Sequence, residues 1–293
     1  MRNEATASRA TEQKVRVAFQ GELGAFSEEA VRLYFGDRAE PVPRREFREV
    51  GRAVVAGEVD YGLLPIENTL AGSVVASYDV LGGEDLRVVG EVIVPIHHCV
   101  LGVPGSTLEK VKRVLSHPVA LAQCTRFLTA HPEIQAVAVY DTAGAAKEVS
   151  EAGDPTVAAI AGRSAAERYG LTILAADVED RPDNQTRFLV VARSDAPAPE
   201  PRVDLDGAWK TALLVETENA PGALVRVLLP FANRAINLSK LESRPGIEPW
   251  TSRFFLELEA HIGAPEMEEA LAEAQRRATA SRVLGSYPRW PLT

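Results

Sequence analysis

The sequence predicts an α/β protein whose first part alternates strands with helices and whose second part has a ferredoxin-like element order. Apolar strands alternate with amphipathic helices over about the first two-thirds of the chain, a pattern typical of sheets rich in parallel strands. The last third instead reads strand, helix, strand, strand, helix, strand. Between the two parts, the segment at 194–206 has three prolines at alternate positions, which favours an extended linker.

Short apolar runs predict the strands of the first part. The run at 15–19 alternates apolar and polar residues, and Ser27 then begins a helix with two glutamates in its first turn. Later runs are apolar on both faces, as expected for a sheet covered by helices. They lie at 61–66, 88–96, 100–103, 157–161 and 188–192. Helices are predicted at 107–115, where aliphatic residues share one face, and at 164–169, which a glycine ends.

The same kinds of signal predict the elements of the second part. Asn219 is expected to cap its first helix, which has Pro221 in the first turn and apolar residues at helical spacing. The second helix begins with glutamates and ends with arginines, which matches the helix dipole. Strands are expected at 211–216, 236–242, 253–259 and 282–287, and helices at 221–233 and 265–278.

Composition indicates a soluble, cytoplasmic protein. Hydrophobic residues make up 46% of the 293 and charged residues 25%, which is ordinary for globular proteins. A net charge of -9 without a basic cluster argues against a nucleic-acid partner, and no run has the roughly 20 apolar residues of a membrane span. The two cysteines are too few for a disulfide framework. Residues 1–14 are expected to form a disordered leader rather than a signal peptide.

A polar pair follows one of the predicted strands. In LPIENTLAGSV, Glu67 and Asn68 come directly after an apolar run, so a carboxylate and an amide stand where ligands bind in α/β folds. Glu67 could act as a general acid only if burial raised its pKa. The alternative is that the two residues form an ordinary turn.

The motif SHPVALAQC places Ser116 just before a predicted helix start. Unpaired backbone N–H groups at such a start attract anions, so we expect Ser116 to bind a substrate carboxylate. The alternative is that Ser116 only caps the helix. Upstream, His97 and His98 precede Cys99, but neighbouring strand residues point in opposite directions and do not readily chelate one ion together. No metal site is therefore predicted.

The motif DNQTRFLVV puts polar side chains at the start of a predicted buried strand. Because side chains alternate along a strand, Thr186 and Phe188 should share one face while Arg187 points to the other. Arg187 is then expected to be a structural ion-pair partner. A bulge at the strand start would instead turn it toward a substrate carboxylate. Taken alone, Thr186 is an ordinary β-branched strand residue.

Taken together and in their order, these motifs resemble the prephenate dehydratase family from about residue 15 onward. The resemblance also includes the motifs GELGAFSEEA, TAGAAKEV and AAIAGRSAAERYGL. The segment APGALVRVLLPFANRAINLSKLESRP resembles the phenylalanine-binding ACT domain that follows the catalytic part in that family. The resemblance implies decarboxylation and dehydration of prephenate to phenylpyruvate, inhibition by L-phenylalanine, and no cofactor. It also implies a two-lobed catalytic domain at 15–193, similar to periplasmic binding proteins, with a second lobe at about 95–180, and an ACT domain at 207–293.

The resemblance also implies roles for individual residues. Thr186 matches the family's catalytic threonine, which donates a hydrogen bond to the leaving hydroxyl. Expected beside it are the catalytic residues Glu67, Asn68 and Arg187 and the substrate-binding residues Ser116, Gln123 and Phe188.

In the second part, the resemblance implies an effector site for phenylalanine. A helix N-terminus would bind the effector carboxylate, and Glu242 or loop carbonyls its ammonium group. The alternative is plain helix packing by small residues. Such domains usually bind their effector at a dimer interface, so a homodimer or homotetramer is expected. The effector residues implied are Asn219, Gly222, Ala223, Leu224, Val225, Glu242, Ser243, Arg244 and Pro245.

Several positions depart from the family pattern, and two other functions stay open. Val119 and Thr69 replace a common Gln and Ser, and Glu257 and Ala260 replace a common Asp and Gly, which leaves effector affinity open. The alternatives are an arogenate dehydratase, which performs the same elimination on the amino-acid analogue, and a non-catalytic amino-acid-binding regulator. A chorismate mutase segment would need several helices and is not expected within the leader, so the chain is expected to be monofunctional.

Overall fold

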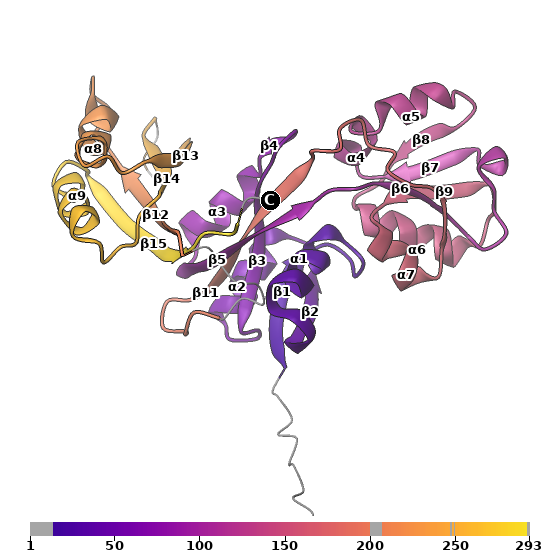
Figure 1. Cartoon of the computed structure of the whole chain (residues 1–293), viewed down its shortest axis with the longest axis horizontal. Coiled ribbons are helices and arrows are strands. Elements are labelled where there is room, and N and C mark those ends of the chain that lie inside the picture. The colour runs from indigo at the N-terminus through magenta and orange to yellow at the C-terminus, as the bar shows by residue number, and fades with distance from the viewer. Residues whose placement is uncertain (1–13, 200–206, 247, 249, 292–293) are drawn as a thin grey trace, which may run out of the picture.

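The computed structural model describes residues 14–199, 207–246, 248 and 250–291, which form three sheets arranged in a row (Figure 1). The expected leader, apart from Lys14, and the second half of the expected linker lie outside these residues. In Figure 1 the first lobe lies in the middle, the second lobe to its right and the C-terminal module to its left. None of the helices in the described part of the chain has the length and apolar character to span a membrane.

The central sheet forms the first lobe. Its strands are β1 (Val15–Gln20), β2 (Ala39–Arg44), β3 (Tyr61–Asn68), β4 (Gly72–Ser73), β5 (Leu86–Pro95) and β11 (Gln185–Arg193), and its helices are α1 (Phe26–Phe35), α2 (Phe47–Val55) and α3 (Val75–Gly83), with a 3-10 turn at Gly36–Arg38. The order is β2-β1-β3-β11-β5, with β4 paired to the end of β3. The first three strands are parallel, whereas β11 runs antiparallel to both of its neighbours.

The second sheet forms the second lobe and has the order β10-β6-β9-β7-β8. Its elements are β6 (Cys99–Gly102), β7 (Arg113–Ser116), α4 (Pro118–Ala122), α5 (Thr125–Ala130), β8 (Gln135–Ala138), α6 (Thr142–Ala152), β9 (Val157–Ala161), α7 (Arg163–Tyr169) and β10 (Thr172–Ala175). The predicted helix at 164–169 is confirmed as α7. The predicted helix at 107–115 is wrong, because a 3-10 turn at Leu108–Lys110 is followed by β7, whose buried Val114 and Leu115 lie between two parallel strands.

Two chain segments, 95–98 and 176–184, connect the lobes and are here called the hinge. The first leaves β5 and the second returns to β11, so the second lobe is inserted between neighbouring strands of the first. The segments are bonded to each other, since Ile96 N donates to the Asn184 carbonyl at 2.8 Å and Val178 N to the His98 carbonyl at 2.9 Å. The predicted two-lobed fold is thus confirmed, with the hinged arrangement that periplasmic binding proteins use to close around ligands.

The C-terminal module has the predicted ferredoxin-like fold. Its elements are β12 (Trp209–Glu216), α8 (Ala223–Ala232), β13 (Leu238–Pro245), β14 (Ser252–Leu258), α9 (Pro265–Gln275) and β15 (Ala280–Pro288). The strands are antiparallel in the order β13-β14-β12-β15. The first helix begins later than predicted, because Gly222, with a φ of 74°, directly precedes it and Asn219 does not cap it.

Both faces of the C-terminal sheet are covered over most of its strands, whereas Leu241, Ser243 and Pro245 of the edge strand β13 are exposed. One face packs on the module's own helices. The other face, which includes Leu214 and Phe255, shares a hydrophobic core with the first lobe, where the rings of Phe255 and Tyr78 lie 5.1 Å apart. The backbones meet directly at Gly285, where a Cβ atom would fall 2.0 Å from the Val88 carbonyl oxygen. The module is therefore packed onto the first lobe rather than joined to it by the linker alone.

Candidate active site

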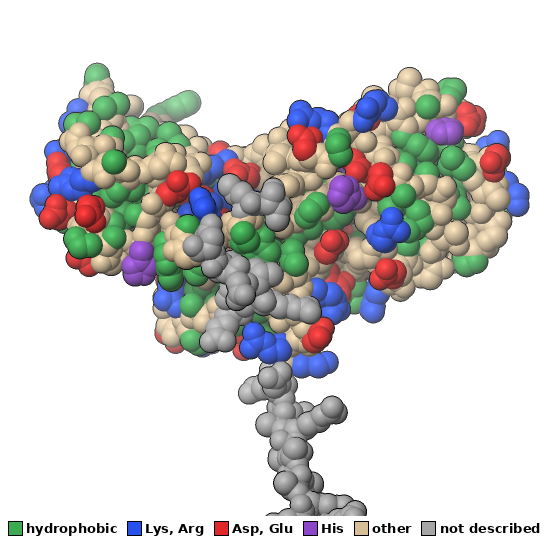
Figure 2. Space-filling view, viewed as in Figure 1, with side chains coloured by type: hydrophobic (Ala, Val, Ile, Leu, Met, Phe, Trp, Pro, Cys, Tyr) green, Lys and Arg blue, Asp and Glu red, His purple; other side chains and the backbone are tan. Residues whose placement is uncertain are grey.

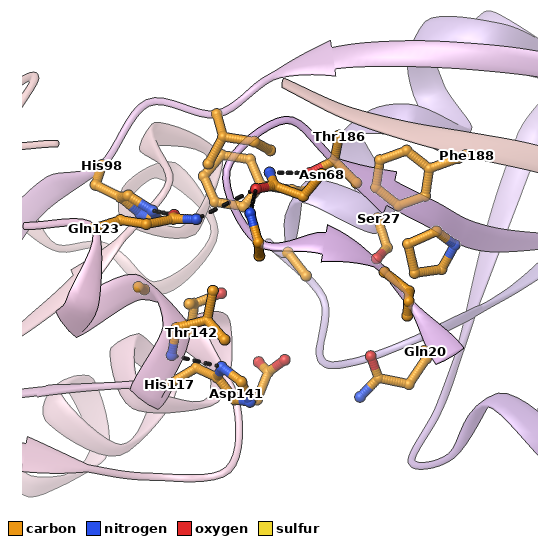
Figure 3. A pocket seen from close by; sticks show the side chains of 18 of the residues that line it. Gln20, Ser27, Asn68, His98, His117, Gln123, Asp141, Thr142, Thr186 and Phe188 are labelled. Carbon is orange, nitrogen blue, oxygen red and sulfur yellow. Dashed lines mark hydrogen bonds between the residues drawn. The ribbon is translucent and has the colours of Figure 1, made fainter. Parts of the chain in front are cut away.

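A cavity of about 390 Å³ lies between the lobes, beside the hinge (Figure 3). The first lobe contributes Ser27, Asn68, Thr186 and Phe188, the second lobe His117, Gln123, Asp141 and Thr142, and the hinge His98. Among the described residues that line it there is no lysine or arginine. A ligand in this cavity therefore meets hydroxyls, amides, histidines and one carboxylate.

Asn68 holds the Thr186 hydroxyl in one direction. The Asn68 Oδ1 atom accepts hydrogen bonds from the backbone N–H groups of Leu70 (3.0 Å) and Ala71 (2.8 Å). Its Nδ2 atom consequently points the other way and donates to Thr186 Oγ1 at 3.0 Å. Because Oγ1 accepts this bond and donates none to the described residues, the hydroxyl proton of Thr186 is free to bind a ligand in the cavity.

Strand β11 presents alternate side chains to two different environments. Thr186 and Phe188 line the cavity, as the alternation predicted. A bulge interrupts the pairing with β3 between Arg187 and Phe188. This bulge does not turn Arg187 into the cavity, and its side chain stays on the opposite face of the sheet.

Arg187 lies in a buried cluster of charges between the first lobe and the C-terminal sheet. Its guanidinium donates to Glu67 (3.2 Å), Glu91 (3.0 Å) and Glu257 (2.9 Å), and the residue is 7% exposed. Glu67 also pairs with Lys240 of β13. The expectation that Glu67 acts in the cavity is therefore corrected, as is the catalytic role that the resemblance gives Arg187, because β3 and β11 direct both side chains away from it. Arg187 is instead the structural ion-pair partner that the strand alternation predicts.

The charge state of Glu67 argues against the general-acid role as well. Burial by itself would raise the pKa of Glu67, but the charges of Arg187 and Lys240 outweigh burial and the pKa is lowered. The carboxylate is therefore ionised at neutral pH and has no proton to donate.

Ser116 is also directed away from the cavity. It is fully buried at the end of β7, and its Oγ donates to the Ile160 carbonyl oxygen at 2.5 Å. The expected contact with a substrate carboxylate is corrected for this reason. The cap of α4 is instead His117, whose Nδ1 accepts the N–H of Val119 at 3.2 Å. Gln123, at the end of α4, does reach the cavity as predicted.

Asp141 and His98 are among the cavity residues that the sequence does not predict as site residues. Asp141 caps α6 by accepting the Gly144 N–H at 2.6 Å, and burial raises its pKa against the effect of that bond. An Asp directly before TAGAAKEV is a helix-start signal that could have located it. The sequence offers His98 only as a possible metal ligand, because it does not show where the hinge lies or what packs beside it.

The GELGA loop after β1 joins the lobes at one side of the cavity. Glu22 accepts hydrogen bonds from the Tyr140 hydroxyl (2.9 Å) and from Lys147 (3.2 Å), both in the second lobe. Gly24 has a φ of 90°, and a Cβ atom there would lie 3.0 Å from the backbone of Ala165. The loop thus brings the two lobes into direct contact and needs glycine to do so.

The expected effector residues of the GALV segment gather at the start of α8. A cavity of about 160 Å³ there is lined by Asn219, Ala223 and Leu224 among others. Gly222 directly precedes this helix, and the side chain of Val225 is largely exposed.

The expected effector residues of the ESRP segment lie elsewhere, on β13. Ser73 of the first lobe donates to Glu242 at 2.6 Å, and Arg244 pairs with Asp79 at 3.0 Å. Ser243 and Pro245 point to the other side and are exposed. Within the described chain, the GALV and ESRP residues therefore do not line one common cavity.

A cleft between hinged lobes, with a directed hydroxyl and several amides on its walls, is the kind of site that binds or transforms a small polar molecule. The sequence model described as prephenate dehydratase matches residues 17–196. The chain belongs to the prephenate dehydratase family.

Known proteins resemble the chain over almost its whole length. Arogenate dehydratase/prephenate dehydratase 2 of Arabidopsis thaliana, a chloroplastic protein, is 41% identical over 98% of this chain and 76% of its own. The bifunctional chorismate mutase/prephenate dehydratase of Stutzerimonas stutzeri is 39% identical over 96% and 75%.

Solved structures resemble the chain over a similar range. The prephenate dehydratase of Arthrobacter aurescens in complex with L-Phe is 36% identical, with a TM-score of 0.85 over 95% of this chain and 92% of that one. A structure described as a novel type of quorum-quenching acylase is also 36% identical, with a TM-score of 0.84 over 94% and 98%.

Proposed function

We propose that this protein is a carbon-oxygen lyase that decarboxylates and dehydrates prephenate to phenylpyruvate and that L-phenylalanine inhibits it. The observation that carries the proposal is the orientation of the Thr186 hydroxyl in the cleft of a prephenate dehydratase family member. Asn68 donates to the hydroxyl oxygen, so the hydroxyl proton of Thr186 is left to bind a ligand in the cavity. The residues proposed to contact substrate are Thr186, Asn68, Gln123 and Phe188.

The reaction needs a group that stabilises a departing hydroxyl. When the ring carboxylate leaves as CO2, the electrons of its C–C bond enter the ring, and the C–O bond on the opposite ring carbon breaks. Negative charge develops on the leaving oxygen. A threonine hydroxyl is too weak an acid to transfer its proton unassisted, but a fixed O–H donor stabilises this charge in the transition state. Thr186 supplies that donor, and Asn68 sets its direction.

Prephenate carries two carboxylates, which this cleft would bind through amide and hydroxyl groups. The N-terminus of α1 faces the cavity through Ala25, Phe26 and Ser27. Ala25 provides no side-chain cap, so the first backbone N–H groups and the Ser27 hydroxyl are available to an anion. Gln123 approaches from the second lobe. Phe188 and Phe26 give the ring an apolar surface between these polar ends.

The cleft favours this elimination over acyl transfer. Acyl transfer by a hydroxyl needs a base within hydrogen-bond reach of the nucleophile. Neither Thr186 nor Ser27 donates to a histidine or carboxylate within the described part of the cleft. The similarity to a structure described as an acylase therefore supports the fold and not that chemistry here.

The test uses the purified full chain with prephenate at neutral pH. Phenylpyruvate is followed by the absorbance of its enolate in alkali, with and without L-phenylalanine, and arogenate is assayed in parallel. We expect rapid formation of phenylpyruvate and its suppression by L-phenylalanine. No phenylpyruvate would overturn the proposal, and turnover of arogenate alone would replace it by the arogenate dehydratase alternative.

We also propose that the effector binds at a homodimer or homotetramer interface built from the C-terminal modules. Figure 2 shows hydrophobic side chains on the surface of this module. Val225 and Leu229 on α8 and Leu241 on β13 are among the large apolar side chains exposed there. Light scattering after size exclusion should give a multiple of the 31.6 kDa chain. A monomer with and without L-phenylalanine would contradict this proposal.

A further inference from the structure

A chain of side-chain amides crosses from the first lobe to the second at the hinge. Asn68 Nδ2 donates to Asn184 Oδ1 at 2.8 Å, and Asn184 Nδ2 donates to Gln123 Oε1 at 3.1 Å. The same Gln123 oxygen lies 3.1 Å from His98 Nε2. Asn184 and His98 are buried at 0% and 2% exposure, so water does not substitute for these bonds.

Backbone contacts at Asn68 fix the direction of each hydrogen bond along this series of side-chain amides. Because two backbone N–H groups bind Asn68 Oδ1, the Asn68 amide must donate to Asn184. Asn184 therefore offers its oxygen to Asn68 and its nitrogen to Gln123. Since Gln123 Oε1 is an acceptor, His98 Nε2 must carry a proton and donate to it. The remaining ring nitrogen, His98 Nδ1, is buried without a hydrogen-bond partner among the described residues.

The environment of His98 agrees with a neutral ring. Burial lowers its pKa, although the bond to Gln123 and the charge of Glu179 oppose this effect. The edge of the Phe26 ring also packs against the imidazole, with 5.5 Å between the ring centroids.

Gln123 Oε1 accepts hydrogen bonds from both Asn184 and His98, so the amide nitrogen of Gln123 is directed toward the cavity. Figure 3 shows the nitrogen end of Gln123 directed toward Asn68, whose Oδ1 atom lies 3.4 Å away. One N–H makes this long bond, and the other is free. A carboxamide flipped by half a turn would instead present an acceptor, which repels anions.

We propose that His98 and Asn184 are positioning residues that hold Gln123 as a hydrogen-bond donor toward an oxygen of the substrate. They determine that this corner of the cleft accepts a carboxylate or keto oxygen and disfavours an ammonium group. The inference rests on the proposed function, because it assigns a partner for one end of the same anionic substrate.

The first experiment measures KM and kcat for prephenate in the full chain. His98→Leu removes one donor on Gln123 and should raise KM about tenfold with little change in kcat. His98→Gln places an amide N–H where Nε2 lies and should restore most of the wild-type KM. The control His97→Gln breaks the neighbouring contact with Glu179 in the same hinge segment and should leave both constants unchanged.

A double variant separates positioning from a general structural effect. In a Gln123→Ala background, which has no amide to orient, His98→Leu should change KM by less than about twofold. Equal damage by His98→Leu and His98→Gln, or a full additional effect without Gln123, would overturn the inference.

A second measurement does not depend on turnover. Nitrogen-15 NMR of the imidazoles, assigned by the signal lost in His98→Gln, should show His98 protonated at Nε2 and unprotonated at Nδ1 at neutral pH. The opposite tautomer, or a charged ring, would overturn the inference even if prephenate is turned over. Wild-type protein that makes no phenylpyruvate would refute the proposed function, whereas the NMR result would still decide whether Gln123 is oriented.

Discussion

At the residue scale, the central feature is a hydroxyl oriented by a neutral amide. Thr186 has no base to remove its proton in the described cleft, so it can donate but not act as a nucleophile. Thr186→Ala should lower kcat about 100-fold and leave KM nearly unchanged, because the donor acts mainly on the departing oxygen. Steady-state kinetics with prephenate checks this, with Thr186→Ser as the control that keeps the hydroxyl. Unchanged turnover in Thr186→Ala would remove the residue from the mechanism.

Asn68 allows a related test in which shape is conserved. In Asn68→Asp the donor to Thr186 becomes an acceptor, so the Thr186 hydroxyl should donate to the new carboxylate instead of to the substrate. We expect kcat to fall by at least about tenfold. The measurement is kcat for correctly folded protein, judged by an unchanged circular dichroism spectrum. Near-normal turnover would show that the direction of the Thr186 proton is unimportant.

At the element scale, β3 and β11 each present one residue to the cleft and the next to the charge cluster. Arg187→Met should leave the three carboxylates of Glu67, Glu91 and Glu257 without their shared cation. Because the Arg187→Met substitution leaves buried carboxylates without this cation, we expect a loss of about 3–5 kcal/mol in the free energy of unfolding.

Urea denaturation measures this loss, and the same chain offers a matched control. Arg181 pairs with Asp183 at 2.6 Å, but both side chains are more than 60% exposed. Arg181→Met should therefore have no measurable effect on stability. Equal effects of the two substitutions would show that burial of the Arg187 cluster contributes nothing.

The ion pair between Glu67 of β3 and Lys240 of the C-terminal sheet should make a contribution to stability that depends on pH. Its pKa is lowered from the ordinary value of 4.5, since Arg187 and Lys240 outweigh burial. The stabilisation is therefore complete above the unfolded-state pKa and is lost as pH falls through the folded-state pKa. The difference in unfolding free energy between wild type and Glu67→Gln should be largest near pH 7 and shrink below about pH 4.5. A pH-independent difference would contradict this assignment.

The local sequence pattern predicts which way the side chains of a strand point, but it does not predict which distant residues they contact. The two-residue period of a strand correctly placed Thr186 and Phe188 on one face and Arg187 on the other. It could not supply Glu91 or Glu257, which lie 96 and 70 residues from Arg187 in sequence. The 107–115 error has a similar origin, because a fully buried parallel strand carries no alternation to distinguish it from a helix. Likewise, nothing local showed that the last residue of so short a strand, Ser116, would be buried.

At the scale of the whole molecule, the C-terminal module binds the back of the strands that carry the cleft residues. Gly222→Val should weaken inhibition by L-phenylalanine about tenfold, because a β-branched residue is strained at a φ of 74° and distorts the start of α8. The inhibition curve is measured relative to each variant's own uninhibited rate. Gly170→Val, with a φ of 66° in the second lobe, introduces the same strain away from the module. Full L-phenylalanine sensitivity in Gly222→Val would refute the effector assignment.

The insertion of the second lobe between β5 and β11 sets an order of assembly during synthesis. Strand β11 lies between β3 and β5, yet the ribosome makes it only after the entire inserted lobe. Contacts such as Asn68 with Thr186, 118 residues apart, must therefore wait until that lobe has emerged. Until then, β3 and β5 lack the strand that pairs with both of them in the folded chain. That strand also delivers Thr186, so the nascent chain has no complete cleft before its first sheet is finished.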